Sequence, residues 1–255
     1  MLAGSPVRSG VLADRGVEEL SGWADAIEAW PVGSHVWGQY AEQIADRVAV
    51  CRTENVSACH AGVAELVDGA LRDIATRALG EPATAFKDKI NYKHPGGAGF
   101  RPHQDRRAYP GVARVLSTLV AIDECTTDSG CLWLADGVDE VLPTDDRGVV
   151  RDDVVASLRW EPAELVAGDV VLLDGLTPHY SEANRGGRRR RVLVASYAPA
   201  REGYSRQHYY SARADTMRRA SEHDGRFRIS TLADFDGIEV AGDAPSGERC
   251  THPTG

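Results

Sequence analysis

Residues 86–105 read F-K-D-K-I-N-Y-K-H-P-G-G-A-G-F-R-P-H-Q-D. The first eight alternate in the manner of a β-strand, and the glycine-rich segment 95–99 that follows is typical of a turn. In an extended chain, side chains two positions apart project from the same face, so His103 and Asp105 can bind one metal ion together. This stretch therefore predicts a β-structure that carries a metal site beyond one of its turns.

Strand-like runs continue on the C-terminal side of this stretch. From about residue 83 onward, short segments rich in Val, Leu and Ile are bounded by Gly, Pro and Asp, at 84–93, 114–122, 131–135, 164–173 and 191–198. Most of them have no helix between them long enough for a parallel crossover. The pattern predicts a mainly β fold, an antiparallel double-stranded β-helix of the jelly-roll, cupin-like type.

The N-terminal part has helical periodicity instead. Apolar residues recur at helical spacing in 17–30 and in 61–79, and Gly80 follows the second run in a C-cap position. We therefore expect one domain over residues 1–255, with a helical layer at about 17–80, a jelly-roll core at about 83–200 and a C-terminal extension at about 201–255. The acidic segment 136–163 indicates a long insertion with a short helix, and 235–255 a loose tail.

Composition excludes several classes of protein. The net charge of −9 argues against general nucleic-acid binding, and no run approaches the roughly 20 apolar residues of a membrane helix. The N-terminus has no continuous apolar segment typical of a secretory signal. Five cysteines without a C-x-x-C pair indicate reduced thiols and no cysteine metal site. We expect a cytoplasmic enzyme for a small-molecule substrate, either a monomer or a homodimer.

A third metal ligand follows far downstream. His179 comes after the apolar run 169–174 and a short turn. Two imidazoles and one carboxylate on one face of an octahedron leave three positions open, the arrangement of Fe(II) sites that take a bidentate 2-oxoacid and O₂. His103, Asp105 and His179 are therefore the candidate ligands of Fe(II).

A serine and an arginine after His179 add a candidate anion site. Ser181 is two residues beyond the histidine, and Arg190 is eleven residues beyond it at the start of an apolar strand. A guanidinium is a planar two-pronged donor that matches a carboxylate, so Arg190 can hold the distal carboxylate of 2-oxoglutarate. For the other three arginines of the run 188–191 we expect a solvated, charged turn.

Together these motifs resemble the phytanoyl-CoA dioxygenase family of iron and 2-oxoglutarate oxygenases. The resemblance rests on 86–105, on D-S-G-C-L at 128–132, on G-D-V-V-L-L-D-G-L-T-P-H-Y-S-E-A-N at 168–184, on Arg190 and on R-Q-H-Y-Y at 206–210. It implies Fe(II), 2-oxoglutarate and O₂, with no catalytic residue beyond the metal ligands. It also implies that Arg190 and Ser181 bind 2-oxoglutarate and that Thr118 and Asn91 border it.

The three lysines of the chain suggest the substrate. Alternation places Lys87, Lys89 and Lys93 on one face of a strand together with Asn91. This face is either a solvated sheet surface or an anion pocket reinforced by Arg106 or Arg107. The motifs F-K-x-K-I-N-Y-K and P-G-G-x-G-F resemble the branch of the family that hydroxylates small phosphonates, which implies a small phosphonate or phosphate metabolite as substrate.

Other functions remain open at this point. Arg106-Arg107 and the segment 135–138 depart from the family pattern near the expected substrate mouth, so a natural-product tailoring oxygenase acting on an amino acid, nucleoside or polyketide is an alternative. A non-catalytic jelly-roll binding protein can share the fold. A zinc hydrolase can use the same three ligands. Metal-dependent uptake of 2-oxoglutarate would distinguish the oxygenase from the hydrolase.

Overall fold

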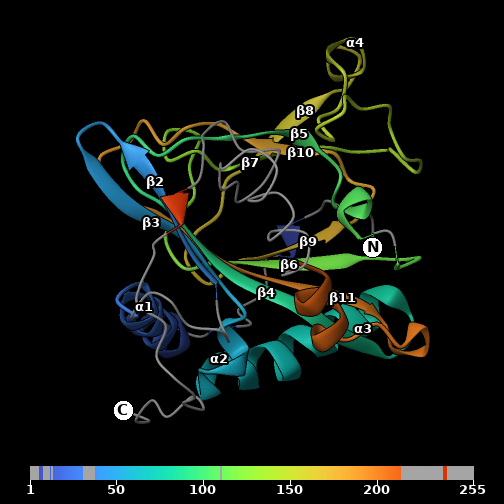
Figure 1. Ribbon diagram of the computed structural model, residues 1–255, viewed down its shortest axis with the longest axis horizontal. Helices are drawn as coiled ribbons and strands as arrows, with labels where there is room; N and C mark the ends of the chain where they lie inside the picture. Colours follow the sequence, from blue (N-terminus) through green and yellow to red (C-terminus); the bar gives the residue numbers. More distant parts are fainter. Residues whose placement is uncertain are drawn as a thin grey trace.

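The computed structural model describes residues 6–7, 12, 14–30, 38–109, 111–213 and 238–239. Two antiparallel sheets lie one above the other, with helices beneath the larger one (Figure 1). The larger sheet has the order β1 (Pro6–Val7), β9 (Val170–Asp174), β6 (Leu116–Ala121), β11 (Arg190–Pro199), β4 (Ala83–Lys93), β3 (Arg47–Glu54), β2 (Gly38–Ile44) and β12 (Ile238–Glu239). The smaller has the order β5 (Phe100–His103), β10 (His179–Ser181), β7 (Leu132–Ala135) and β8 (Trp160–Ala163). This is the predicted mainly β, double-stranded β-helix architecture.

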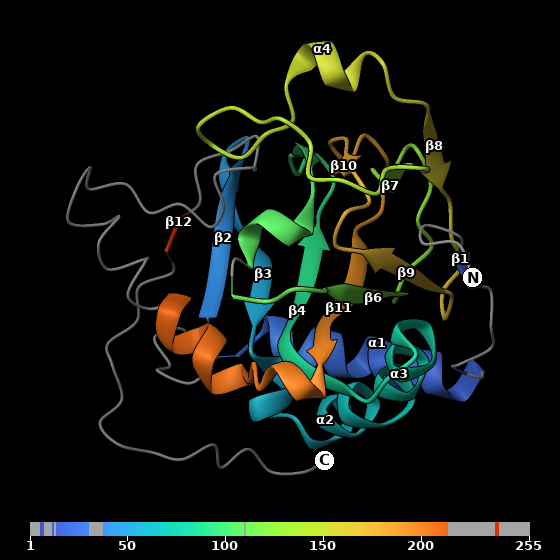
Figure 2. The ribbon, with the colours of Figure 1, turned by 90° about the vertical axis from the view of Figure 1, so that its right-hand side faces the viewer.

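Three helical segments cover one face of the larger sheet (Figure 2). They are α1 (Asp14–Glu28), α2 (Ala61–Leu66) and α3 (Arg72–Leu79), with a π-turn at Val67–Leu71 between the last two. Gly80 ends α3 with φ of 76°, a left-handed conformation that glycine adopts at low cost. The predicted helices are thus confirmed. Shorter helical elements are η1 (Val56–Ala58), η3 (Asp105–Ala108), α4 (Asp152–Val155), η4 (Ala200–Glu202) and residues 206–213.

The larger sheet separates two apolar layers. On its outer face, side chains such as Leu193 and Tyr197 of β11 pack against Leu20 and Leu71 of the helices. Its inner face, which looks toward the smaller sheet, contributes Val192 and Val194 to a second cluster with residues of both sheets. Full burial of one such side chain stabilises the fold by about 1.5–3 kcal/mol. Both faces of β11 are therefore packed, and every one of its residues is buried.

The helical layer expected at about 17–80 requires a correction. Between its helices, β2 and β3 form a hairpin that extends the larger sheet through pairing of β3 with β4. Polar residues of this hairpin, Arg52 and Glu54 among them, are buried, so the strands lack an apolar alternation that would reveal them. The run 164–173 also forms a strand only from Val170, because Gly168 turns the chain with φ of 91°.

Two further expectations concern the cysteines and the chain ends. Cys51, Cys125 and Cys131 are buried free thiols, whereas Cys59 is disulfide-bonded, so the expectation of reduced thiols is wrong at that position. The short helix expected in 136–163 is α4. The tail expected at 235–255 lies outside the described residues apart from β12. Within the described part of the chain, no helix combines the length and apolar character needed to cross a membrane.

Candidate metal centre

The smaller sheet brings the three predicted ligands together. His103 ends β5 and His179 begins β10, and the two are directly paired across these antiparallel strands. Asp105 follows at the start of η3, with its Oδ1 4.0 Å from Nε2 of His103. One ligand atom from each of the three residues lies within 4.8 Å of the others. The pairing of β5 with β10 thus brings His179 to the His103–Asp105 pair.

Backbone carbonyls orient both imidazole rings. Nδ1 of His103 lies 2.7 Å from the carbonyl oxygen of Arg101, and Nδ1 of His179 lies 3.0 Å from that of Thr177. A ring that donates from Nδ1 keeps its Nε2 lone pair for a metal, which is the usual second-sphere arrangement of metal-binding histidines. The donor set therefore fits a divalent cation.

The electrostatics of the cluster agree with this fit. Burial, helped by the neighbouring His179, lowers the pKa of His103 to about 3, so its ring is neutral at physiological pH. Burial alone raises the pKa of Asp105, but His179, His103 and Lys89 outweigh it and hold the pKa below its ordinary value. Neutral imidazole and ionised carboxylate are the protonation states that bind a metal.

Two polar residues beside the ligands were not found from the sequence. Gln104 is buried between His103 and Asp105, and its amide nitrogen donates to the carbonyls of Glu140 and Leu176 while its oxygen accepts from the Leu142 amide. Ser117 of β6 places its Oγ 3.3 Å from Oδ2 of Asp105. Gln104 thus holds the ligand segment to two loops, and Ser117 orients the carboxylate.

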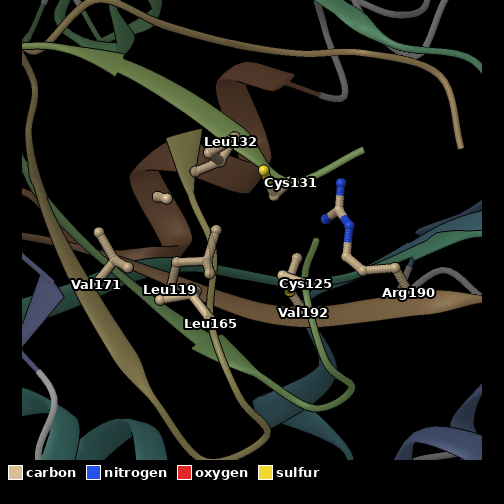
Figure 3. Close-up of a pocket in the computed structure, with 9 residues that line it drawn as sticks. Leu119, Cys125, Cys131, Leu132, Leu165, Val171, Arg190 and Val192 are labelled. Atoms are coloured by element: carbon tan, nitrogen blue, oxygen red, sulfur yellow. The ribbon is translucent and has the colours of Figure 1, made fainter. Parts of the chain in front are cut away.

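Arg190 opens β11 and enters an apolar pocket between the two sheets (Figure 3). The pocket is lined by Leu119, Cys125, Cys131, Leu132, Ala163, Leu165, Val171 and Val192. Arg190 is only 4% exposed, its Nη2 donates to the Gly130 carbonyl at 2.6 Å, and its Nε has no partner. Among the described residues no carboxylate pairs with it. A buried, unpaired guanidinium is costly, so this pocket fits an incoming carboxylate.

The glycine of the D-S-G-C-L motif makes this arrangement possible. Gly130 has φ of 73°, and a Cβ there would lie 2.4 Å from the Glu182 carbonyl and 3.1 Å from Nζ of Lys93. The Gly130 carbonyl accepts hydrogen bonds from Nη2 of Arg190 and, at 3.3 Å, from Nζ of Lys93. Nζ of Lys93 also donates to Oγ of Ser181 at 2.8 Å. Ser181, Lys93 and Arg190 therefore meet at one end of the inner face.

Comparison with known protein families matches residues 3–192 to the phytanoyl-CoA dioxygenase (PhyH) family. The chain belongs to this family. It is 33% identical to a methylphosphonate hydroxylase of Gimesia maris, over 89% of this chain and 88% of that protein. It is also 33% identical to a 2-aminoethylphosphonate dioxygenase of an uncultured bacterium, over 79% of each chain.

The phytanoyl-CoA dioxygenase fold extends to solved structures. The structure of EctD from S. alaskensis with bound Fe superimposes with a TM-score of 0.68 at 19% identity, covering 79% of this chain and 74% of that one. With the family membership and the His-Asp-His cluster, this makes the protein a dioxygenase that depends on iron and 2-oxoglutarate. The predicted fold, enzyme class and cofactors are confirmed.

Thr118, which is predicted to border 2-oxoglutarate, faces the helices in the structure. Thr118 is paired with Ala195 and Leu172, which face the helices, and its hydroxyl donates to the Ala195 carbonyl. It lies on the opposite face of β6 from Ser117, which contacts Asp105. On β6 the metal ligands are therefore faced by Ser117 and not by Thr118, because alternation alone does not tell which face is inward.

The residues predicted to bind or border the substrate fall into three groups. Lys89 and Asn91 lie on the inner face of β4 beside Val194 and Val192 of β11. Lys87 donates to the Tyr109 hydroxyl at 3.0 Å, and Lys93 belongs with Ser181 and Arg190. The guanidinium groups of Arg106 and Arg107 donate to the carbonyls of Tyr109 and Leu142. Of these side chains, Lys89 alone has no hydrogen bond or ion pair with another described residue.

The arginine run 188–191 also differs from the solvated turn expected for three of its members. Arg191 is 3% exposed and bonds Asp123 and Asp25 on the outer face. Arg189 pairs with Asp25 and with Glu28. Arg188 alone is an exposed side chain. The expectation therefore holds for Arg188 and is wrong for Arg191.

Proposed function

We propose that the protein hydroxylates a C–H bond of a small phosphonate. His103, Asp105 and His179 bind Fe(II), and Arg190 binds the distal carboxylate of 2-oxoglutarate. The observation that carries the proposal is the convergence of two imidazoles, an ionised carboxylate and a buried guanidinium without a carboxylate partner between the two sheets. The names of the relatives in Gimesia maris and the uncultured bacterium support a phosphonate substrate.

The protein groups position the reactants rather than react themselves. When bound, iron and 2-oxoglutarate activate O₂, so that 2-oxoglutarate is converted to succinate and CO₂ while one oxygen atom enters the substrate C–H bond. Arg190 orients the co-substrate through two parallel donors, and the Lys93–Ser181 contact lies beside it. The apolar lining of the pocket excludes water from this end of the site.

Lys89 is the best-placed side chain for the substrate anion. It projects to the inner face opposite Val194, and among the described residues it has neither a hydrogen-bond nor an ion-pair partner. Burial, with Arg52 and Lys87 nearby, lowers the pKa of Lys89 well below its ordinary value, and Lys89 lies close enough to the metal ligands to lower the pKa of both His103 and Asp105. A phosphonate carries between one and two negative charges at neutral pH, fewer than a phosphate monoester, and would supply the missing counter-charge.

Turnover with a substrate panel tests the proposal. Purified protein with Fe(II), 2-oxoglutarate and O₂ should form succinate faster when a small phosphonate is added, with an equal amount of hydroxylated phosphonate. Lys89→Met should raise the apparent KM for the phosphonate about 10- to 100-fold, as expected for loss of a charge-assisted hydrogen bond, with the KM for 2-oxoglutarate unchanged. Arg188→Met removes an exposed charge and is the matched control.

The panel also includes amino acids and nucleosides. These compounds distinguish a phosphonate hydroxylase from a natural-product tailoring oxygenase. If one of these accelerates succinate formation and no phosphonate does, the phosphonate assignment is wrong while the oxygenase class stands. If neither class accelerates it and 2-oxoglutarate does not bind in the presence of metal, the assigned site residues are wrong as well.

A further inference from the structure

We infer that the substrate anion carries no ammonium group, so that the enzyme takes alkylphosphonates and discriminates against aminoalkylphosphonates. This inference rests on the proposed function and narrows its substrate class. It is argued from the hydrogen-bonding capacity left open beside Lys89, and from the carboxylates that are already engaged there.

Glu54 is the carboxylate that faces Lys89. The two residues are directly paired across β3 and β4, so their side chains share the inner face. Glu54 is 1% exposed and already holds two arginines, with Oε1 3.3 Å from Nη1 of Arg52 and Oε2 2.7 Å from Nε of Arg213. Nη2 of Arg213 also donates to Oε1 at 3.3 Å. The single negative charge of Glu54 is thus shared by two guanidinium groups, although Oε2 forms no hydrogen bond with the Arg213 Nε that lies 2.7 Å away.

The other buried carboxylates near this strand are engaged as well. Asp105 belongs to the metal site, and Asp88 projects to the opposite face, where it pairs with Arg206. Glu42 of β2 accepts a hydrogen bond from the Ala98 amide at 3.0 Å. None of these three offers a free acceptor beside Lys89.

Lys89 and Asn91 contribute open donors to the inner face. Lys89 has its ammonium protons available, and Asn91 accepts from Nε of Arg52 through Oδ1, at 3.0 Å, which leaves its amide nitrogen free to donate. Phosphonate oxygens are acceptors and satisfy such donors. Burial, together with the charges of Arg52 and Lys87, lowers the pKa of Lys89 well below its ordinary value, and a substrate ammonium beside them would add a further positive charge. The site is therefore complementary to an anion and opposed to a zwitterion.

Acidic side chains of the neighbouring loop do not change this balance. Asp136, Asp139 and Glu140 are exposed to solvent. Exposed ion pairs are worth about 0–1 kcal/mol because water and salt screen them. They cannot offset the loss of hydration of an ammonium group placed beside Lys89.

Two matched substrate pairs test the inference on the unmodified enzyme. Methylphosphonate is compared with aminomethylphosphonate, and ethylphosphonate with 2-aminoethylphosphonate, so each pair differs by one ammonium group. In each pair that is turned over, kcat/KM for the unaminated compound should be higher by about 10- to 100-fold. Equal or greater turnover of the aminated compound would overturn the inference and leave the phosphonate proposal intact. If neither pair is turned over, the proposed function itself fails.

A second test removes one of the two arginines that pair with Glu54. Arg213→Met removes one of its two partners, so the ratio of kcat/KM for 2-aminoethylphosphonate to that for ethylphosphonate should rise about tenfold. Arg188→Met is the control and should leave the ratio unchanged. Anaerobic calorimetric binding of the same two ligands to the metal- and 2-oxoglutarate-loaded protein should show the same shift in Kd ratio. An Arg213→Met protein that is folded, by circular dichroism, but keeps the original ratio would contradict the role given to Glu54.

Discussion

At the start of β11, the two faces of the larger sheet differ in how they hold a buried arginine. On the outer face, under the helices, Arg191 bonds both carboxylate oxygens of Asp123 at 2.8 Å, and Asp88 is paired with Arg206. On the inner face, the adjacent Arg190 and also Lys89 have no carboxylate within ion-pair distance in the described chain. A buried charge with a built-in partner contributes to the fold, whereas one without a partner favours a bound anion.

Loss of a metal ligand should give the largest effect, confined to function. His103→Ala removes one imidazole of the triad, so succinate formation from 2-oxoglutarate should fall below detection. Fe(II) or Co(II) titration under anaerobic conditions should show correspondingly weak binding. Circular dichroism should be unchanged, because the ring bonds only the Arg101 carbonyl in the described structure. Substantial turnover in this variant would remove His103 from the metal site.

Arg190→Met should give the next largest effect, again on the inner face. Removal of the guanidinium should raise the apparent KM for 2-oxoglutarate about 100-fold, since losing one partner of a buried charge pair costs roughly 2–5 kcal/mol. Thermal stability should not fall, because Arg190 has no internal carboxylate to leave unpaired. Arg188→Met is the control from the same run and should be nearly silent. If Arg188→Met raises this KM instead, the strand register is wrong by two.

Arg191→Met should show the reverse behaviour. It leaves Asp123 without its bidentate partner beneath α1, so the free energy of unfolding should fall by roughly 2–3 kcal/mol, less than for a fully buried pair because Asp123 is partly exposed. Urea denaturation measures this change. The KM for 2-oxoglutarate of the folded protein should stay the same. A large KM change with unaltered stability would mean that the two faces are exchanged.

These contrasts also show what local sequence can and cannot determine. The alternation in 86–93 correctly separates Lys87, Lys89 and Asn91 from Asp88, because strand geometry alone sets a period of two. Alternation does not tell which face is inward. The sequence therefore favours Thr118, whereas in the structure Ser117 contacts the metal ligand Asp105. Gln104 had no local signal either, since its amide donates to carbonyls 36 and 72 residues away.

The hairpin of β2 and β3 was missed for a different reason. Its buried face carries Arg52 and Glu54, which form an ion pair. Glu54 also pairs with Arg213. Buried polar residues that satisfy one another erase the apolar period by which strands are recognised. The metal ligands were easier to predict, because H-x-D depends only on the spacing of an extended chain. The part of the site that selects the substrate depends on distant partners and required the structure.

The smallest predicted effects distinguish the faces at one pair of neighbours on β6. Ser117→Ala removes the hydroxyl 3.3 Å from Asp105, so metal affinity should fall about tenfold, as for other partners that orient a metal-binding carboxylate. Thr118→Val keeps the shape but removes a hydroxyl that donates to the Ala195 carbonyl, so unfolding should become easier by about 1 kcal/mol while metal affinity is unchanged. Anaerobic Co(II) titration and urea denaturation of both variants separate the two roles. A loss of metal or 2-oxoglutarate affinity in Thr118→Val, with none in Ser117→Ala, would place the co-substrate against Thr118 and reverse the assignment of the inner face.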